Sequence, residues 1–156
     1  EFITTDSKQS QMLQRLEGYT KALDNNGLDA SVLEVPYRYD ASHMIQQIVA
    51  FLKSREDIDA VLFATNYMAV RGLEAINQLG RTSLGVVSYD DHDVFTLFKP
   101  AVTAVAQPTE AIANHVIDKM LNLLNIKNKK VIPPVLVLPT HLIKRESAPR
   151  KEVSQN

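Results

Sequence analysis

The chain has 156 residues and a net charge of −1 at pH 7, with 17 Lys and Arg against 18 Asp and Glu. This length allows one domain with a buried core, and the near-neutral charge argues against strong binding of this chain itself to DNA or RNA. The absence of cysteine excludes disulfides and thiol catalysis, no apolar run is long enough to predict a membrane span, and the first residues lack the pattern of a signal peptide.

The first half of the chain alternates strand and helix patterns. Strands are predicted at Glu1–Thr5, Ala30–Val35 and Ala60–Ala64, and helices at Gln9–Asn26, Ser42–Ser54 and Tyr67–Leu79. Apolar residues recur at helical spacing in each predicted helix. Ser42 is the expected N-cap of the second helix, and Gly27 and Gly80 are expected to end the first and the third.

The second half continues the pattern and then becomes irregular. Strands are predicted at Leu84–Tyr89 and Val102–Val105, a helix at Glu110–Leu124, short extended pieces at Val131–Leu138 and His141–Ile143, and a disordered polar tail from Arg145 to Asn156. The alternation of strands and helices predicts the α/β class. We expect a doubly wound, mostly parallel five-stranded sheet with helices on both faces.

The segment Val86–Asp91 is the most informative part of the sequence. An apolar strand ends there in two adjacent carboxylates, and a second strand, ending in Gln107–Pro108, follows after a short irregular stretch. Ligands of open α/β sheets bind beyond the carboxyl ends of the strands. Acids at that edge suit a small ligand with hydroxyl or amine groups; the plainer interpretation is that they cap the next helical turn.

Several separated motifs resemble one family. They are Arg15–Tyr19 with Ala22–Leu23, Leu62–Asn66 leading into Met68–Ala69, Leu79–Gly80, Val86–Asp91, Pro100 with Val102–Thr103 and Val105–Pro108, and finally Leu138–Pro139 with Leu142–Ile143, Arg145 and Ser147. In this order and spacing they resemble the C-terminal part of the effector-binding region of lactose/galactose-repressor-type transcription regulators. That region has the fold of periplasmic sugar-binding proteins, and the closing Leu-Pro to Arg-x-Ser pattern favours the repressors over the secreted proteins.

The resemblance implies which residues contact the ligand. Arg15, in the Arg-x-x-Gly motif, corresponds to a principal effector contact, and Asp90 is the expected second contact because a carboxylate accepts two hydroxyl hydrogen bonds. Gln107 is expected to be a ligand contact or a hinge where the chain crosses the cleft. Tyr39 matches an aromatic residue that stacks on the ligand, although Tyr37 is an alternative.

The sequence also departs from the family pattern. The family has Asn-Asp-x-Met at the start of the helix after the third strand, whereas this chain has Thr65–Met68. Asn66 is the expected contact there, matched either to the family asparagine with a gap or to the aspartate without one; the usual acid is missing in both alignments. Ser88 and Ala113 replace common glycines, and the loop between Gly80 and Leu84 is short.

The resemblance implies a division of the chain and a function. Residues 1–106 would form the C-terminal effector-binding subdomain, residues 107–146 a crossing helix and strands that pack on an absent N-terminal subdomain, and residues 147–156 a polar tail. We expect a cytoplasmic, homodimeric, non-enzymatic sensor of a small effector, a sugar or a nucleoside-like molecule. It would need no cofactor or membrane and would contact DNA only through an absent N-terminal domain.

Two other functions remain as alternatives. One is a secreted or lipid-anchored sugar carrier of a transporter, and the other is a flavodoxin-like phosphorelay or hydrolytic domain. A metal site at Asp90–Asp93 is disfavoured because adjacent residues cannot all face one ion without a dedicated loop. The sequence contains no Gly-x-Ser-x-Gly motif and no glycine-rich phosphate loop.

The helix predicted at Glu110–Leu124 has a wide apolar stripe. If the N-terminal subdomain is absent, this stripe has no partner. We therefore expect the isolated chain to hide the stripe, either by folding it back on its own sheet or by association with a second copy. Deletion from Thr109 onward is expected to leave a folded five-stranded sheet that associates less.

Overall fold

The computed structural model describes residues 1–125 and 135–148. Its elements are, in chain order, β1 Phe2–Thr5, α1 Ser10–Asp24, β2 Val32–Val35, α2 Ala41–Ser54, β3 Ala60–Phe63, α3 Asn66–Gln78, β4 Gly85–Tyr89, the 3-10 helix η1 Asp93–Thr96, β5 Thr103–Ala106, α4 Thr109–Asn125 and β6 His141–Ile143. The predicted α/β alternation is confirmed, with boundaries shifted by a residue or two. Of the extended piece expected at Val131–Leu138, residues 131–134 lie outside the described part, and residues 135–138 are not a strand.

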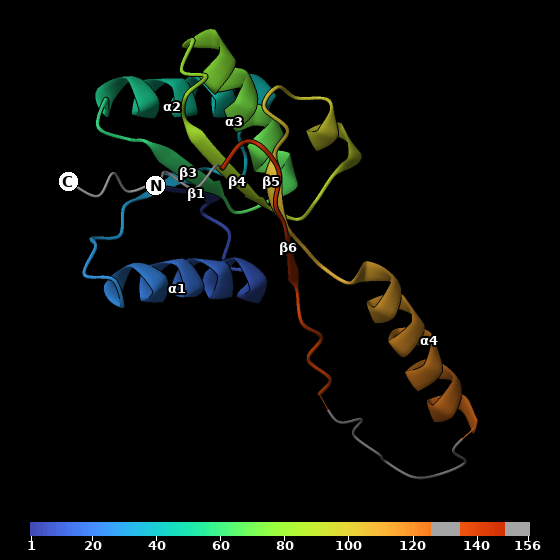
Figure 1. Cartoon of the computed structure of the whole chain (residues 1–156). Coiled ribbons are helices and arrows are strands. Elements are labelled where there is room, and N and C mark those ends of the chain that lie inside the picture. Colours follow the sequence, from blue (N-terminus) through green and yellow to red (C-terminus); the bar gives the residue numbers. More distant parts are fainter. Residues whose placement is uncertain (126–134, 149–156) are drawn as a thin grey trace, which may run out of the picture.

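The strands form one sheet in the order β2-β1-β3-β4-β5-β6. The first five strands are parallel, as expected, and β6 adds a sixth, antiparallel strand, with Ala104 opposite Ile143. Helix α1 covers one face of the sheet, and α2 and α3 cover the other (Figure 1). The predicted doubly wound class is therefore confirmed. Because the five parallel strands point the same way, the residues that follow them meet at a single edge.

Each face of the sheet has its own apolar core. On the α2/α3 face, the fully buried side chains include Ile3, Ile48 and Phe63. On the α1 face, Phe2 and Met12 pack with half-buried Tyr19, whose ring lies 5.1 Å from that of Phe2. The alternation of Phe2 and Ile3 between the two cores follows from the two-residue period of a strand.

The helix ends are capped partly as the sequence predicts. Gly27 and Gly80 adopt the left-handed backbone conformation, with φ of 66° and 65°, just beyond α1 and α3. The prediction that Ser42 caps α2 is wrong, because α2 begins at Ala41 and the Asp40 carboxylate accepts the backbone N–H of His43 at 2.9 Å. Aspartate and serine are comparable N-caps, so sequence alone favours neither position.

The expected disorder from Arg145 onward is wrong for the first residues of that segment. Ser147 is buried, and its hydroxyl accepts the Thr103 backbone N–H at 2.8 Å and donates to the Val86 carbonyl. The Ser147 backbone carbonyl accepts the Val86 N–H, and the Ser147 backbone N–H donates to the Ala101 carbonyl. Residues 145–147 therefore extend the sheet contacts of β6 instead of forming a tail. Residues 149–156 lie outside the described part of the chain.

Helix α4 projects away from the sheet (Figure 1). Its apolar side chains are 38% to 78% exposed, from Ile112 at the low end to Leu124 at the high end. The expectation that the stripe folds back on the chain's own sheet is therefore wrong. In the part of the chain described here, no helix is both long and apolar enough to cross a membrane.

Candidate functional site

Arg15 and Asp90 meet at the carboxyl edge of the sheet. The two Nη atoms of Arg15 donate to the two carboxylate oxygens of Asp90 at 2.8 and 2.9 Å. Arg15 also donates to the Ala64 carbonyl at 2.6 Å, directly after β3. The pair is only partly shielded, with 13% of the Arg15 side chain and 25% of the Asp90 side chain exposed. The bidentate geometry gives both side chains a fixed orientation.

Gln107 and Tyr89 complete the cluster around this pair. The Gln107 side-chain amide donates to Asp90 Oδ1, which also accepts Arg15 Nη2. The Arg15 guanidinium carbon lies 4.9 Å from the centre of the Tyr89 ring, within the range of a cation–π contact. Three predicted site residues are thus brought together: Arg15 from α1, Asp90 directly after β4 and Gln107 directly after β5. We call these three residues the Asp90 cluster.

The Asp90 cluster retains capacity for further hydrogen bonds. An ionised carboxylate has about four lone-pair sites, and Asp90 uses three of them for Arg15 and Gln107. A guanidinium has five N–H donors, and three of those on Arg15 are used by Asp90 and Ala64. A partly exposed group of this kind can both donate to and accept from neighbouring hydroxyl groups. No cluster of side chains that could hold a metal ion is found among the described residues.

Asp90 adopts a strained backbone conformation. Its φ of 62° is in the left-handed region, where aspartate occurs more readily than most non-glycine residues. Its backbone N–H still donates to the Val105 carbonyl at 2.9 Å, so the sheet continues to this residue. The chain bends at this residue, directly after β4. Strained residues of this kind concentrate at functional sites.

Asn66 and Tyr39 lie farther along the same edge. Thr65 is the N-cap of α3, its hydroxyl accepting the Met68 N–H at 3.1 Å, and Asn66 is the first helical residue and is half-buried. Tyr39 packs against the core beside α2, with its ring 5.6 Å from that of His43, whereas Tyr37 is 72% exposed. Within the described residues, no hydrogen bond or ion pair joins Asn66 or Tyr39 to the Asp90 cluster. Both follow strands of the same sheet, so they flank the cluster rather than form part of it.

A second ion pair stands next to the first, and the sequence analysis did not predict it. Arg145 donates both Nη atoms to the carboxylate of Asp91 at 2.7 and 2.8 Å, and also donates to the Val102 carbonyl at 2.7 Å. The two side chains are 16% and 26% exposed. In the sequence, Arg145 is recognisable only as part of the closing motif with Ser147. The sequence carries no local signal for this pair, because a partly exposed acid can be solvated by water and its partner is 54 residues away.

The Asp91–Arg145 pair makes part of the stability depend on pH. Hydrogen bonds from Arg145 lower the pKa of Asp91 below its usual value. A lowered folded-state pKa contributes stability above the unfolded value of about 4, and this contribution is lost as pH falls through the folded value. We expect the difference in free energy of unfolding between the wild type and Asp91→Asn to be constant from pH 8 to about 5 and to shrink in more acidic solution. Urea titrations at each pH measure it, and in an Arg145→Gln background the shrinkage should disappear; its persistence there would contradict the assignment.

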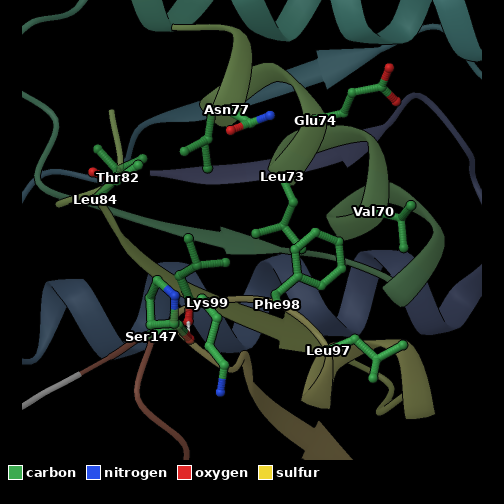
Figure 2. Close-up of a pocket in the computed structure, with 13 residues that line it drawn as sticks. Val70, Leu73, Glu74, Asn77, Thr82, Leu84, Leu97, Phe98, Lys99 and Ser147 are labelled. Carbon is green, nitrogen blue, oxygen red and sulfur yellow. Dashed lines mark hydrogen bonds between the residues drawn. The ribbon is translucent and has the colours of Figure 1, made fainter. Parts of the chain in front are cut away.

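A separate groove lies on the α3 face, away from the Asp90 cluster. It has a volume of about 560 Å³ and is lined mainly by apolar residues of α3, the start of β4 and the segment after η1. Figure 2 shows the Phe98 ring pointing toward Leu73, with Leu97 and Lys99 on the same side of the groove. Leu97 is 78% exposed. None of the predicted ligand contacts lines this groove.

Comparisons with known proteins agree on one family. The model of the periplasmic binding protein-like domain matches residues 1–148. Among curated proteins, the HTH-type transcriptional regulator CelR of Thermobifida fusca is 32% identical over 141 residues, covering 86% of this chain and 40% of CelR. The chain thus spans less than half the length of this relative.

Solved structures support the same fold. A lac repressor dimer bound to operator and the anti-inducer ONPF aligns with a TM-score of 0.77 over 94% of this chain and 51% of its own, at 23% identity. The complex of the transcriptional regulator CelR with cellobiose aligns with a TM-score of 0.71 over 94% of this chain and 46% of its own, at 28% identity. These similarities agree with the predicted resemblance to repressor effector-binding regions.

Proposed function

The chain belongs to the periplasmic binding protein-like domain family, and from this membership we propose that it is the sugar-sensing part of a DNA-binding transcriptional regulator. The observation that carries the proposal is the Asp90 cluster at the carboxyl edge of the sheet. A charged donor fork and a charged acceptor, both partly exposed, suit a ligand whose hydroxyl groups both donate and accept. That one similar regulator has been solved with cellobiose supports a sugar as the ligand class.

Within the site, we propose that Arg15 and Asp90 are the principal contacts. Gln107 is proposed to bind the ligand or to act as the hinge where the chain leaves the sheet, because it joins β5 to α4 while bonding Asp90. Asn66 and Tyr39 are proposed as flanking contacts, the tyrosine by stacking on the apolar face of the sugar. The same hydrogen-bonding side chains can bind hydroxyl groups of different sugars. Cellobiose is therefore used as a probe of the ligand class.

A sugar titration followed by 15N–1H NMR tests this function. If a complete cleft gives micromolar affinity, about −8 kcal/mol, half of the contacts leave about −4 kcal/mol, which corresponds to roughly millimolar affinity. We expect saturable shifts with cellobiose or another saccharide in a mono- and disaccharide panel, centred on the Asp90 amide and the Gln107 side chain. Shifts only with a purine nucleoside would assign a different ligand class, and no shift with any of these compounds would contradict a small-molecule effector of either kind.

The proposed mechanism is linkage between ligand and DNA binding. A sugar held between two subdomains favours one relative orientation of them, and that orientation changes the affinity for DNA of a separate reading domain. We propose that α4 belongs to the second subdomain's side of this cleft. The rest of the segment expected there, residues 107–146, divides differently, because β6 and Arg145 are bonded to β5 and the residue before it, in the sheet of this subdomain. The exposed stripe of α4 is consistent with a helix that packs on a further part of the protein.

The DNA-reading function is proposed to lie outside this chain. With a net charge of −1, the chain has no surplus of cations with which to release counterions from a duplex. We expect no measurable binding to duplex DNA at physiological salt, and no salt-dependent change in fluorescence anisotropy of a labelled duplex. Micromolar binding that weakens steeply with added salt would contradict this expectation.

We also propose that the protein acts as a cytoplasmic homodimer and not as an enzyme. The similar regulators are transcription factors, and one was solved as a dimer on its operator. The groove of Figure 2 suits self-association because it is apolar and carries both Glu74 and Lys99. We propose that in a twofold interface each copy's Glu74, which lies 3.9 Å from its own Arg71, faces the Lys99 of the other copy.

The isolated chain is expected to associate through its exposed apolar surfaces. Light scattering should give a mass above the 17.4 kDa of one chain. Leu121→Lys in α4 and Leu97→Lys at the groove should each lower that mass, whereas Leu28→Lys, at an exposed leucine away from both surfaces, should not. Deletion from Thr109 onward is not the clean test that the sequence suggested, because it also removes β6 and the contacts of Ser147. A monomeric wild type would contradict the prediction.

A further inference from the structure

The two adjacent acids after β4 have different partners and, we infer, different roles. Asp90 faces Arg15, while Asp91 faces Arg145, which comes from the segment after β6. We propose that Asp91 and Arg145 form a positioning pair, which fixes the turn after β4 so that the Asp90 carboxylate faces the ligand. The inference rests on the proposed function only in calling the Asp90 cluster a sugar site.

The first step of the argument concerns the backbone of the turn. Asp90 has a φ of 62°, a conformation that is less favourable than the extended or helical one even for aspartate and that surrounding contacts must stabilise. On its N-terminal side, the turn is held by the Asp90 N–H bond to Val105. On its C-terminal side, the nearest strong restraint is the bidentate contact of Asp91 with Arg145, at 2.7 and 2.8 Å. The left-handed residue is thus held from both ends.

The second step concerns the anchor itself. Arg145 is not a mobile surface side chain, because it also donates to the Val102 carbonyl, and its backbone N–H donates to the Thr103 hydroxyl at 2.9 Å. Two residues later, Ser147 is buried between β4 and β5. Arg145 is therefore attached to the rigid sheet. A fixed cation next to Asp91 can transmit that rigidity to the neighbouring residue, Asp90.

The third step concerns charge. Along the edge, the order is Arg15, Asp90, Asp91 and Arg145, so each carboxylate has its own guanidinium. If Arg145 is removed, Asp91 loses its partner, while Arg15 remains bound to the adjacent Asp90. Asp91 then competes with Asp90 for the remaining cation, Arg15. As a result, the turn no longer holds the Asp90 carboxylate in one orientation.

A test without ligand addresses the pair directly. In the full chain, Asp91→Asn and Arg145→Gln should change the three-bond HN–Hα coupling of Asp90, which reports φ, and broaden the Arg15 guanidinium resonances. Asp93→Asn and Lys144→Gln make the same charge changes at exposed neighbours and should leave both signals unchanged. Arg145→Lys keeps the charge without the two-pronged geometry and should give intermediate values.

The same variants are then titrated with cellobiose or the saccharide that the wild type binds. The dissociation constants of Asp91→Asn and Arg145→Gln should rise about three- to tenfold, and those of the two controls should not change. Unchanged coupling at Asp90 and unchanged Arg15 resonances in Asp91→Asn would overturn the inference, whatever the sugar result. Displaced signals together with no saccharide binding by the wild type would support the positioning pair and contradict the sugar function. If Asp91→Asn does not fold, Asp91→Glu, which moves the carboxylate by one methylene, replaces it under the same criteria.

Discussion

Arg15→Ala is expected to raise the dissociation constant for the bound saccharide at least tenfold. Arg15 holds Asp90 with two hydrogen bonds and has donors to spare for ligand hydroxyls. Loss of charge-assisted hydrogen bonds in a site of this kind costs roughly 1.5–3 kcal/mol of binding free energy. Asp90→Asn should have a comparable effect, because the amide replaces one acceptor oxygen with a donor and removes the charge opposite Arg15.

Saccharide titrations of Arg15→Ala and Asp90→Asn measure this loss of affinity, and they need controls for the change in charge and for correct folding. Arg38→Ala removes an exposed arginine that follows β2, and it should leave the affinity unchanged. The spectrum of each variant, with dispersed core resonances such as those of Phe63, shows whether the sheet is intact. Unchanged affinity in both Arg15→Ala and Asp90→Asn would contradict the site assignment.

Gly72→Ala is expected to destabilise the fold by about 2–3 kcal/mol, near the upper end of overpacking effects. A Cβ at this position of α3 would lie 2.0 Å from Cζ of Phe63 and 2.1 Å from its Cε1. Phe63 is fully buried in β3, so its ring has no free space into which to move. Alanine has a higher helix propensity than glycine, but that gain of roughly 1 kcal/mol is smaller than the expected clash.

Two variants separate the clash from a general effect of glycine substitution. Gly18→Ala in α1 has nothing within 4 Å of the new Cβ, so urea unfolding should show a gain of about 0.5–1 kcal/mol. Phe63→Leu combined with Gly72→Ala should be less destabilised than the sum of the two single variants, because the smaller side chain accommodates the methyl group. A strictly additive pair, or a neutral Gly72→Ala, would show that the α3–β3 contact is looser than this structure indicates.

The elements were predictable from sequence because their signals are local. Apolar periodicity located the four long helices and the five parallel strands, and Gly27 and Gly80 marked helix ends because few other residues accept positive φ. The choice of Asp40 over Ser42 as N-cap was not predictable, since both residue types cap well and the His43 contact decides. The family pattern allows two alignments of Asn66, with or without a gap. In the structure, Thr65 is the N-cap and Asn66 is the first residue of α3.

The contacts of the last described residues were not predictable, because they span the chain. Asp91 and Arg145 are 54 residues apart, and Ser147 bonds Val86 across 61. The polar composition from Arg145 onward predicts a disordered tail unless the distant partners of its residues are known. The strand pattern placed Asp90 and Gln107 at the carboxyl edge, and the family resemblance added Arg15 and the roles of all three. The direct pairing of Arg15 with Asp90, 75 residues away, is a property of the folded chain.

A crystal structure of the chain with the saccharide that binds most tightly tests the central claim most directly. We predict sugar hydroxyls within hydrogen-bond distance of the Asp90 carboxylate and the Arg15 guanidinium. The Gln107 side chain should either bind the same sugar or move away from Asp90 and leave room for it. A saccharide bound in the groove of Leu73 and Phe98, with the Arg15–Asp90 pair unchanged and without ligand, would contradict the account.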